Sequence, residues 1–273
     1  MNHATRSHYH HSIPRLFIPF LRAVLGIRSS IRRDGALLLQ GAHPTPRVLN
    51  SENIPADSPF LLAVNHYDRP GLGAWWGAAL IIGAIAARRP RDTRELHFTM
   101  AAEWWYPRGF GRVVKQPLTR LFFGQLAKAY GLLTLPPVVE EYRGQAAPSI
   151  RRALTLVRGD APELVGLAPE GHTGPNLALC EPPAGAGLFL LLLAHDQIPI
   201  LPVGLYEDDD ATLTAKFGAP FDLCVPRTLE RAARDRKAVR AVMIAIGKLL
   251  PARMWGAYRD VIASDLSEAI SRD

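Results

Sequence analysis

Short apolar runs alternate with longer segments of helical periodicity along most of this chain. The runs that predict strands are Ala36–Leu39, Phe60–Val64, Leu96–Met100, Leu164–Ala168, Ile198–Leu205 and Thr212–Phe217. The segments that predict helices lie near 71–87, 117–130, 149–158, 185–195 and 227–250. Strands that alternate with helices predict an α/β fold, with a mainly parallel sheet and helices on both faces. In such sheets, ligands bind beyond the carboxyl ends of the strands.

An amphipathic pattern covers residues 14–33. Its apolar positions recur at helical spacing: Leu16, Phe17, Phe20, Leu21, Val24 and Ile27. Arginines interrupt this stretch, so it is too short and too charged to span a bilayer. Pro19 is expected to kink or end the first turns. Two interpretations stay open, a helix that lies in a membrane interface and a helix that packs on its own domain.

Three regions are expected along the chain. The uncharged stretch 71–87 is short for a membrane span and predicts a buried core helix. We therefore expect an N-terminal tail and amphipathic helix in 1–35, one α/β domain in 36–225, and C-terminal helices in 226–273 that pack on the same domain.

Composition and charge favour an anionic partner. The 273 residues are 48% hydrophobic and carry a formal net charge of +7. Such a surface suits phospholipid headgroups, coenzyme A, an acidic carrier protein or nucleic acid. The two cysteines, Cys180 and Cys224, have neither metal-ligand nor disulfide spacing, and no metal site is expected. The lack of a disulfide framework favours a reduced, cytoplasmic-side protein. The start of the chain is rich in histidine (His3, His8, His10 and His11), lacks a signal-peptide pattern and predicts a disordered tail.

Polar residues follow three of the predicted strands. Asn65 and His66 end the first strand, and the segment 169–174 (Pro-Glu-Gly-His-Thr-Gly) ends the second. The third is the run 198–205, which begins Ile-Pro-Ile-Leu-Pro-Val. In this order the three resemble the glycerolipid acyltransferase superfamily. That family has an Asn-His motif after a strand, then a Phe-Pro-Glu-Gly-Thr-Arg-Ser-like motif, then a Pro-Ile-Val-Pro-Val strand, and the resemblance covers roughly residues 36–225.

The resemblance implies a fatty acyl transfer to a hydroxyl of a (lyso)glycerolipid or related membrane lipid alcohol. His66 would be the general base, since the pKa of imidazole lies near working pH. The acyl donor would be acyl-CoA or acyl-carrier protein as co-substrate, with no other cofactor. The protein would act in phospholipid biosynthesis, peripherally, on the cytoplasmic side of the cell membrane. The acceptor site would include Asn65, Arg69, Glu170, Gly171, His172 and Thr173.

The catalytic motif departs from the family pattern of His-x-x-x-x-Asp. The fifth residue after His66 is Gly71, and the nearest acid is Asp68. Asp68 is predicted either to orient the His66 ring or to cap a helix that begins near Pro70. Glu170 and Glu103 are the other acids that could partner the ring. His66 itself could also be a strand-end residue that caps the next helix.

The phosphate-binding features depart as well. The family's Gly-Thr-Arg-Ser becomes Gly171-His172-Thr173-Gly174, so its basic residue is missing. Either Arg69, Arg112 or Arg120 replaces that cation, or the acceptor lacks a phosphate at this place. These departures also suit a non-catalytic relative that binds lipid.

Aromatic and basic residues gather between 88 and 120, including Trp104, Trp105 and Tyr106. This composition suits a membrane interface or a lid over a lipid. It also suits single-stranded nucleic acid, but the aromatic residues are clustered rather than interleaved with basic ones. A nucleic-acid partner is therefore disfavoured.

Overall fold

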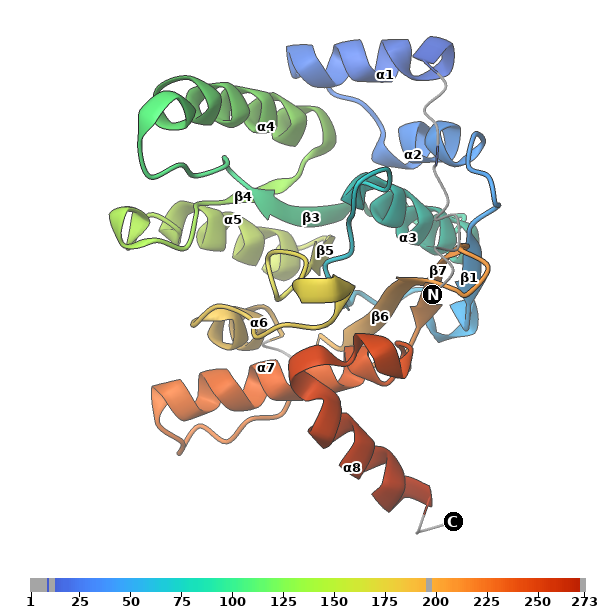
Figure 1. Cartoon of the computed structure of the whole chain (residues 1–273), viewed down its shortest axis with the longest axis vertical. Coiled ribbons are helices and arrows are strands. Elements are labelled where there is room, and N and C mark those ends of the chain that lie inside the picture. Colours follow the sequence, from blue (N-terminus) through green and yellow to red (C-terminus); the bar gives the residue numbers. More distant parts are fainter. Residues whose placement is uncertain (1–8, 10–12, 195–197, 271–273) are drawn as a thin grey trace.

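One seven-stranded sheet organises the chain (Figure 1). The structure is a computed structural model that describes Tyr9 and residues 13–194 and 198–270. The strand order is β1-β7-β6-β2-β5-β3-β4. All neighbours run parallel except β6 and β7, which are antiparallel. The strands are β1 Arg47–Leu49, β2 Leu61–Val64, β3 Leu96–Ala101, β4 Leu133–Leu135, β5 Leu164–Leu167, β6 Ile200–Glu207 and β7 Leu213–Phe217.

The central strands β2, β5 and β6 are buried along their whole length. A parallel sheet needs cover on both faces, which explains the continuous apolar runs of these strands. The α-helices are α1 Ile13–Leu25, α2 Ile31–Leu39, α3 Ala74–Arg88, α4 Gln116–Tyr130, α5 Ala147–Arg158, α6 Ala186–Leu193, α7 Arg231–Gly247 and α8 Arg259–Ile270.

The helices cover both faces of the sheet. The crossovers through α3 and α4 run toward the β4 edge, whereas those through α5 and α6 run back toward β6. Because such crossovers are right-handed, opposite directions place helices on opposite faces. α7 packs on α6, β6 and β2, and so extends the α5–α6 layer. The expected fold class, a mainly parallel α/β sheet with helices on both faces, is confirmed.

One strand prediction was wrong, and two strands were missed. Residues 36–39 were expected to form a strand, but they are the last residues of helix α2. Ser30 caps the start of this helix, and its hydroxyl accepts a hydrogen bond from the Arg33 N–H. α2 packs on the outside of α3, so its apolar residues face a helix rather than a strand. The missed strands β1 and β4 have three residues each, too few to show a period of two.

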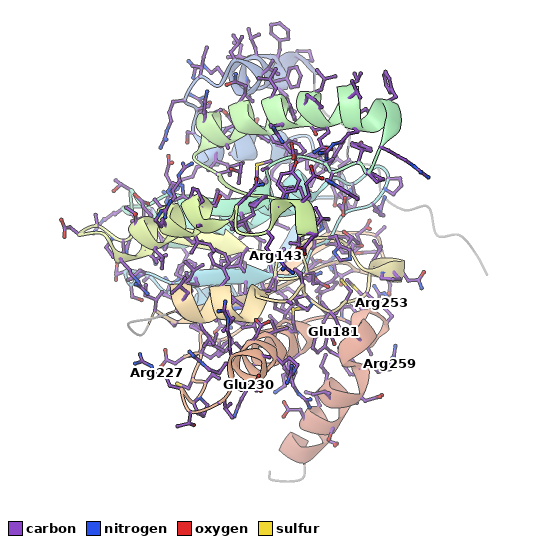
Figure 2. The ribbon with its side chains drawn as sticks, turned by 90° about the vertical axis from the view of Figure 1, so that its left-hand side faces the viewer. Arg143, Glu181, Arg227, Glu230, Arg253 and Arg259 are labelled. Atoms are coloured by element: carbon purple, nitrogen blue, oxygen red, sulfur yellow. The ribbon has the colours of Figure 1, made fainter. Side chains whose placement is uncertain are left out.

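The amphipathic segment 14–33 folds as two helices instead of one. α1 continues through Pro19 and ends at Leu25, and Gly26 then turns the chain with a φ of 65°. α1 packs against α4, and these two helices lie at one end of the molecule, with α8 at the other (Figures 1 and 2). No helix in the described part of the chain is both long enough and apolar enough to span a membrane.

The C-terminal segment is tied to the rest of the chain by polar contacts. The Tyr258 hydroxyl donates to Glu181 at 3.0 Å, and the Arg253 guanidinium donates to the backbone oxygen of Glu207 at 2.7 Å. Figure 2 labels Glu181, Arg253 and Arg259 on the side of the molecule that faces the viewer. The chain after α7 is therefore fixed near the end of β6.

Candidate functional site

The carboxyl ends of β2 and β5 bring the first two polar segments together. The two strands are parallel neighbours in which Leu61 pairs with Val165 and Ala63 with Leu167. The residues that follow them therefore leave the sheet at the same edge. This adjacency places the loop that starts at Asn65 beside the loop that starts at Ala168.

Asn65 fixes the end of β2 to β6. Its side-chain amide donates to the Leu205 backbone oxygen at 2.9 Å and accepts from the Leu205 N–H at 2.7 Å. The side chain is buried. In this structure, Asn65 closes the β2–β6 pairing and so sets the position from which His66 leaves the sheet.

Glu170 ties three segments together from a buried position. Its side chain is almost completely buried, with 1% of the residue exposed. One carboxylate oxygen accepts from the His66 N–H at 2.9 Å and the other from the Cys180 N–H at 2.8 Å. Burial raises the pKa of Glu170, and these two N–H groups oppose that rise. Glu170 therefore holds the backbone of His66, and its carboxylate does not bond to the ring.

The ring of His66 contacts two side chains through one nitrogen. Nδ1 lies 2.9 Å from the Thr173 hydroxyl and 3.3 Å from a carboxylate oxygen of Asp68. Nε2 makes no hydrogen bond to any residue that the structure describes. Asp68 thus lies where an orienting acid is expected, three residues earlier than in the His-x-x-x-x-Asp pattern.

The surroundings of His66 keep its ring neutral. Burial lowers the pKa of His66 below its ordinary value, the negative charge of Asp68 opposes this, and His172 adds to it. A ring that is neutral at pH 7 can accept a proton. Its polar contacts and its pKa therefore both suit a general base.

The chain turns directly after Asp68. Arg69 and Leu72 exchange two backbone hydrogen bonds around Pro70 and Gly71. Gly71 has a φ of 84°, which suits the third position of a type II turn that has proline in the second. The helix α3 starts only at Ala74, with Gly73 as its N-cap. The alternative of Asp68 as a cap for a helix near Pro70 was therefore wrong.

Arg69 is buried and paired. Its guanidinium binds the Glu207 carboxylate through two nitrogens, with the Nε contact at 2.6 Å. The Tyr67 hydroxyl donates to the same carboxylate at 2.8 Å. Arg69 and Glu207 side chains are only 3% and 9% exposed. The charge of Arg69 is therefore balanced within the fold and joins the first loop to the end of β6.

His172 and Cys180 lie beside Glu170. The His172 Nδ1 donates to the Glu170 backbone oxygen at 3.0 Å, and its Nε2 lies 3.8 Å from the Cys180 sulfur. Gly171 turns the chain between Glu170 and His172 with a φ of 71°. Burial, followed by the charge of Glu170, raises the pKa of the Cys180 thiol to about 11. At neutral pH this thiol is protonated and is a weak nucleophile.

Glu103 belongs to a separate polar cluster that follows β3. It binds the guanidinium of Arg120, the amide of Gln116 and the hydroxyl of Tyr142. Arg112 pairs with Glu141 in the same region. Glu103 is thus not the partner of His66, and Arg112 and Arg120 are both engaged in ion pairs.

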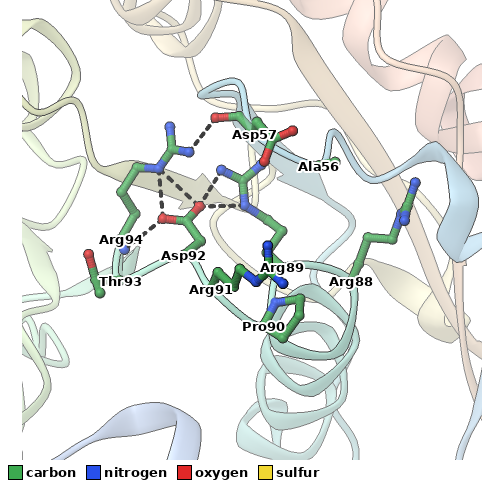
Figure 3. A pocket seen from close by; sticks show the side chains of 9 residues that line it. All are labelled: Ala56, Asp57, Arg88, Arg89, Pro90, Arg91, Asp92, Thr93 and Arg94. Atoms are coloured by element: carbon green, nitrogen blue, oxygen red, sulfur yellow. Dashed lines mark hydrogen bonds and ion pairs between the residues drawn. The ribbon is translucent and has the colours of Figure 1, made fainter.

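A cavity of about 480 Å³ lies at the amino ends of the strands, beside the segments that precede β2 and β3 (Figure 3). Arg89 and Arg94 both bind Asp92 in its wall, and Arg89 also donates to the Ser58 backbone oxygen at 2.9 Å. These ion pairs and hydrogen bonds hold together the loops that precede β2 and β3. Among the described residues, no three His, Cys, Asp or Glu side chains are placed to hold a metal ion. The histidines near the start of the chain lie outside those residues.

Two contacts of the site were missed in the sequence. Glu207, the partner of Arg69, is 138 residues away along the chain. Cys180, the second donor to Glu170, follows a loop with no recognisable motif. Glu207 is the first of four consecutive acids and the only one that still belongs to the buried strand β6. That position could have indicated it, because a buried carboxylate needs a cation or hydrogen-bond donors.

The chain was compared with protein families, curated proteins and solved structures. No family model matches this chain, and no curated protein matches it. Among solved structures, it is similar to the crystal structure of the 1-acyl-sn-glycerophosphate (LPA) acyltransferase PlsC from Thermotoga maritima. The two share 17% sequence identity over 78% of this chain and 75% of that chain, with a TM-score of 0.46. A likeness at this level gives no information on the reaction, which has to be inferred from the side chains themselves.

Proposed function

We propose that this protein transfers a fatty acyl group from acyl-CoA or acyl-carrier protein to a hydroxyl of a membrane lipid, with His66 as general base. The observation that carries the proposal is the state of the His66 ring. Its Nδ1 contacts Thr173 and Asp68, its Nε2 has no bond to the described residues, and its pKa is lowered. The ordered strand-end motifs around this ring support acyl transfer as its chemistry.

The proposed reaction is direct. Nε2 of His66 takes the proton of the acceptor hydroxyl while that oxygen attacks the thioester carbonyl carbon. The tetrahedral intermediate then breaks its C–S bond, and the imidazolium returns the proton to the thiolate that leaves. The high pKa of Cys180 argues against a covalent acyl-enzyme.

The acceptor is proposed to have no phosphate next to its reactive hydroxyl. Three arginines were candidates to replace the family's basic residue, and each is in an ion pair: Arg69 with Glu207, Arg112 with Glu141, and Arg120 with Glu103. A phosphate bound to any of these guanidinium groups would be repelled by the carboxylate beside it. A neutral lipid alcohol, such as a diacylglycerol or a glycolipid, would not be repelled.

A membrane surface is the proposed source of the acceptor. Most of the large exposed apolar side chains lie on α1 and on residues 104–122, and they include Phe17, Phe20 and Leu121. Residues 13–28 and 104–130 contain no acid. We call the exposed apolar and basic side chains of these two segments the α1–α4 surface. Apolar side chains interspersed with basic ones favour an interface of anionic lipids.

The test is the release of free CoA thiol from palmitoyl-CoA by the purified full chain. The acceptors are lysophospholipids, glycerol phosphate, diacylglycerol and glycolipid alcohols, and the control is His66→Ala. We expect release that depends on a neutral acceptor and is lost in His66→Ala. If no acceptor supports release, even with acyl-carrier protein as the donor, the enzyme proposal fails and a non-catalytic lipid-binding protein becomes the better reading.

A further inference from the structure

The Thr173 hydroxyl makes three hydrogen bonds inside the site. It donates to a carboxylate oxygen of Asp68. It accepts from the Asp68 backbone N–H at 3.2 Å and lies 2.9 Å from Nδ1 of His66. Thr173 comes from the loop after β5, whereas His66 and Asp68 come from the loop after β2. One hydroxyl therefore joins the two loops at the ring.

The chemistry of a hydroxyl fixes the direction of these bonds. A hydroxyl has one hydrogen to donate and two lone pairs to accept with. Its hydrogen goes to Asp68, because an ionised carboxylate can only accept. The contact with His66 must then be donated by the ring, so Nδ1 carries the hydrogen and Nε2 carries the free lone pair.

Asp68 by itself holds the His66 ring less firmly than Thr173 does. Its direct contact with Nδ1 is 3.3 Å, longer than the 2.9 Å contact from Thr173. Its side chain is 45% exposed, so water competes for the carboxylate. The Thr173 hydroxyl holds both the backbone and the side chain of Asp68, and it is the closer partner of the ring.

We propose that Thr173 is a positioning residue that links Asp68 to His66 and sets the ring tautomer. In the family pattern an acid stands at the position that Gly71 occupies here. The link between Thr173 and Asp68 would take over the role of that acid. The catalytic consequence rests on the proposed function, whereas the tautomer does not. It also gives Thr173 a different role from the acceptor contact that the sequence indicated.

The tautomer can be measured without any activity. Nitrogen-15 spectra of the histidine rings, assigned by loss of the His66 signals in His66→Gln, should show Nδ1 protonated and Nε2 unprotonated in the wild type at pH 8. Thr173→Val keeps the size of the side chain and removes its hydroxyl, and it should shift His66 toward a mixture of tautomers. Thr173→Ser should restore the wild-type pattern. An unchanged pattern in Thr173→Val would overturn the proposal.

Kinetics test the link between Thr173 and Asp68 once an acceptor has been identified. Thr173→Val should lower kcat by about 10- to 100-fold with little change in KM, because an unoriented base is a poor one. In an Asp68→Asn background the same change should cost less than about threefold, since residues that act as one unit are not additive. Equal losses in both backgrounds would overturn the link. A protein without transferase activity but with the expected tautomer pattern would refute only the proposed function.

Discussion

The backbone N–H of His66 donates a 2.9 Å hydrogen bond to the carboxylate of Glu170, a residue 104 positions later in the chain. The same carboxylate accepts from the Cys180 N–H. The proposed base is therefore held in two ways, its backbone by Glu170 and its ring by Thr173 and Asp68. Changes at these positions should affect different properties of the protein.

Replacing Glu170 should disturb folding as well as the site. In Glu170→Gln, an amide NH₂ would face one of two backbone N–H groups that now donate to oxygen. A buried donor without a partner costs about 1–3 kcal/mol. We expect that loss in the free energy of unfolding measured with urea, together with reduced activity. His66→Gln is the control, since its side chain is partly exposed and should change activity far more than stability.

The pH dependence of kcat/KM should follow the neighbours of His66. Burial lowers the pKa of His66, Asp68 opposes this and His172 adds to it. A neutral base is required, so the acid limb should lie below the ordinary histidine value of 6.5. Asp68→Asn should move the limb to lower pH, and His172→Gln should move it to higher pH. Shifts of the same sign in both variants would contradict this assignment.

The buried pair of Arg69 and Glu207 should matter for stability. Removing one partner of a buried ion pair leaves an uncompensated charge and costs roughly 3–5 kcal/mol. We expect Arg69→Met to lower the free energy of unfolding by about this much. The double variant Arg69→Met with Glu207→Leu should recover a large part of it. A double variant as unstable as the sum of the two single changes would show that packing, and not the charge, dominates here.

The cluster around Asp92 should contribute to acid sensitivity. Burial disfavours the charged form of Asp92, but hydrogen bonds from Arg94 and Arg89 outweigh it and lower its pKa from 3.8 to about 2. A lowered pKa in the folded state gives stability that is complete above the unfolded value and is lost as pH falls toward 2. The difference corresponds to about 2 kcal/mol. Urea unfolding between about pH 2 and 5 should be less pH-dependent in Asp92→Asn than in the wild type.

The α1–α4 surface should bind anionic vesicles. We expect Phe20→Ser with Leu121→Ser to weaken co-sedimentation with phosphatidylglycerol–phosphatidylcholine vesicles by about tenfold or more, since both side chains are exposed and apolar. Leu192→Ser is the control, because Leu192 is an exposed leucine on α6. Binding should also weaken at high salt. Equal binding by the double variant and the control would place the membrane contact elsewhere.

The sequence by itself determined most of the architecture. Apolar runs predicted β2, β3, β5, β6 and β7, because strands buried in a parallel sheet need apolar residues on both faces. Helical periodicity predicted the helices between them. The strand prediction from apolar runs failed at residues 36–39, which belong to an outer helix, and it missed β1 and β4, which are too short to show a pattern.

The tertiary structure decided the partners within the site. The sequence indicated His66, Asp68, Glu170 and Thr173, but not which of these groups touch. The parallel pairing of β2 with β5 brings the two loops to one edge of the sheet, and the turn at Pro70 and Gly71 directs the chain after Asp68. Local sequence encodes backbone preferences over a few residues. The bonds from Thr173 to Asp68 and from Arg69 to Glu207 span more than a hundred residues, so only packing of the whole sheet sets them.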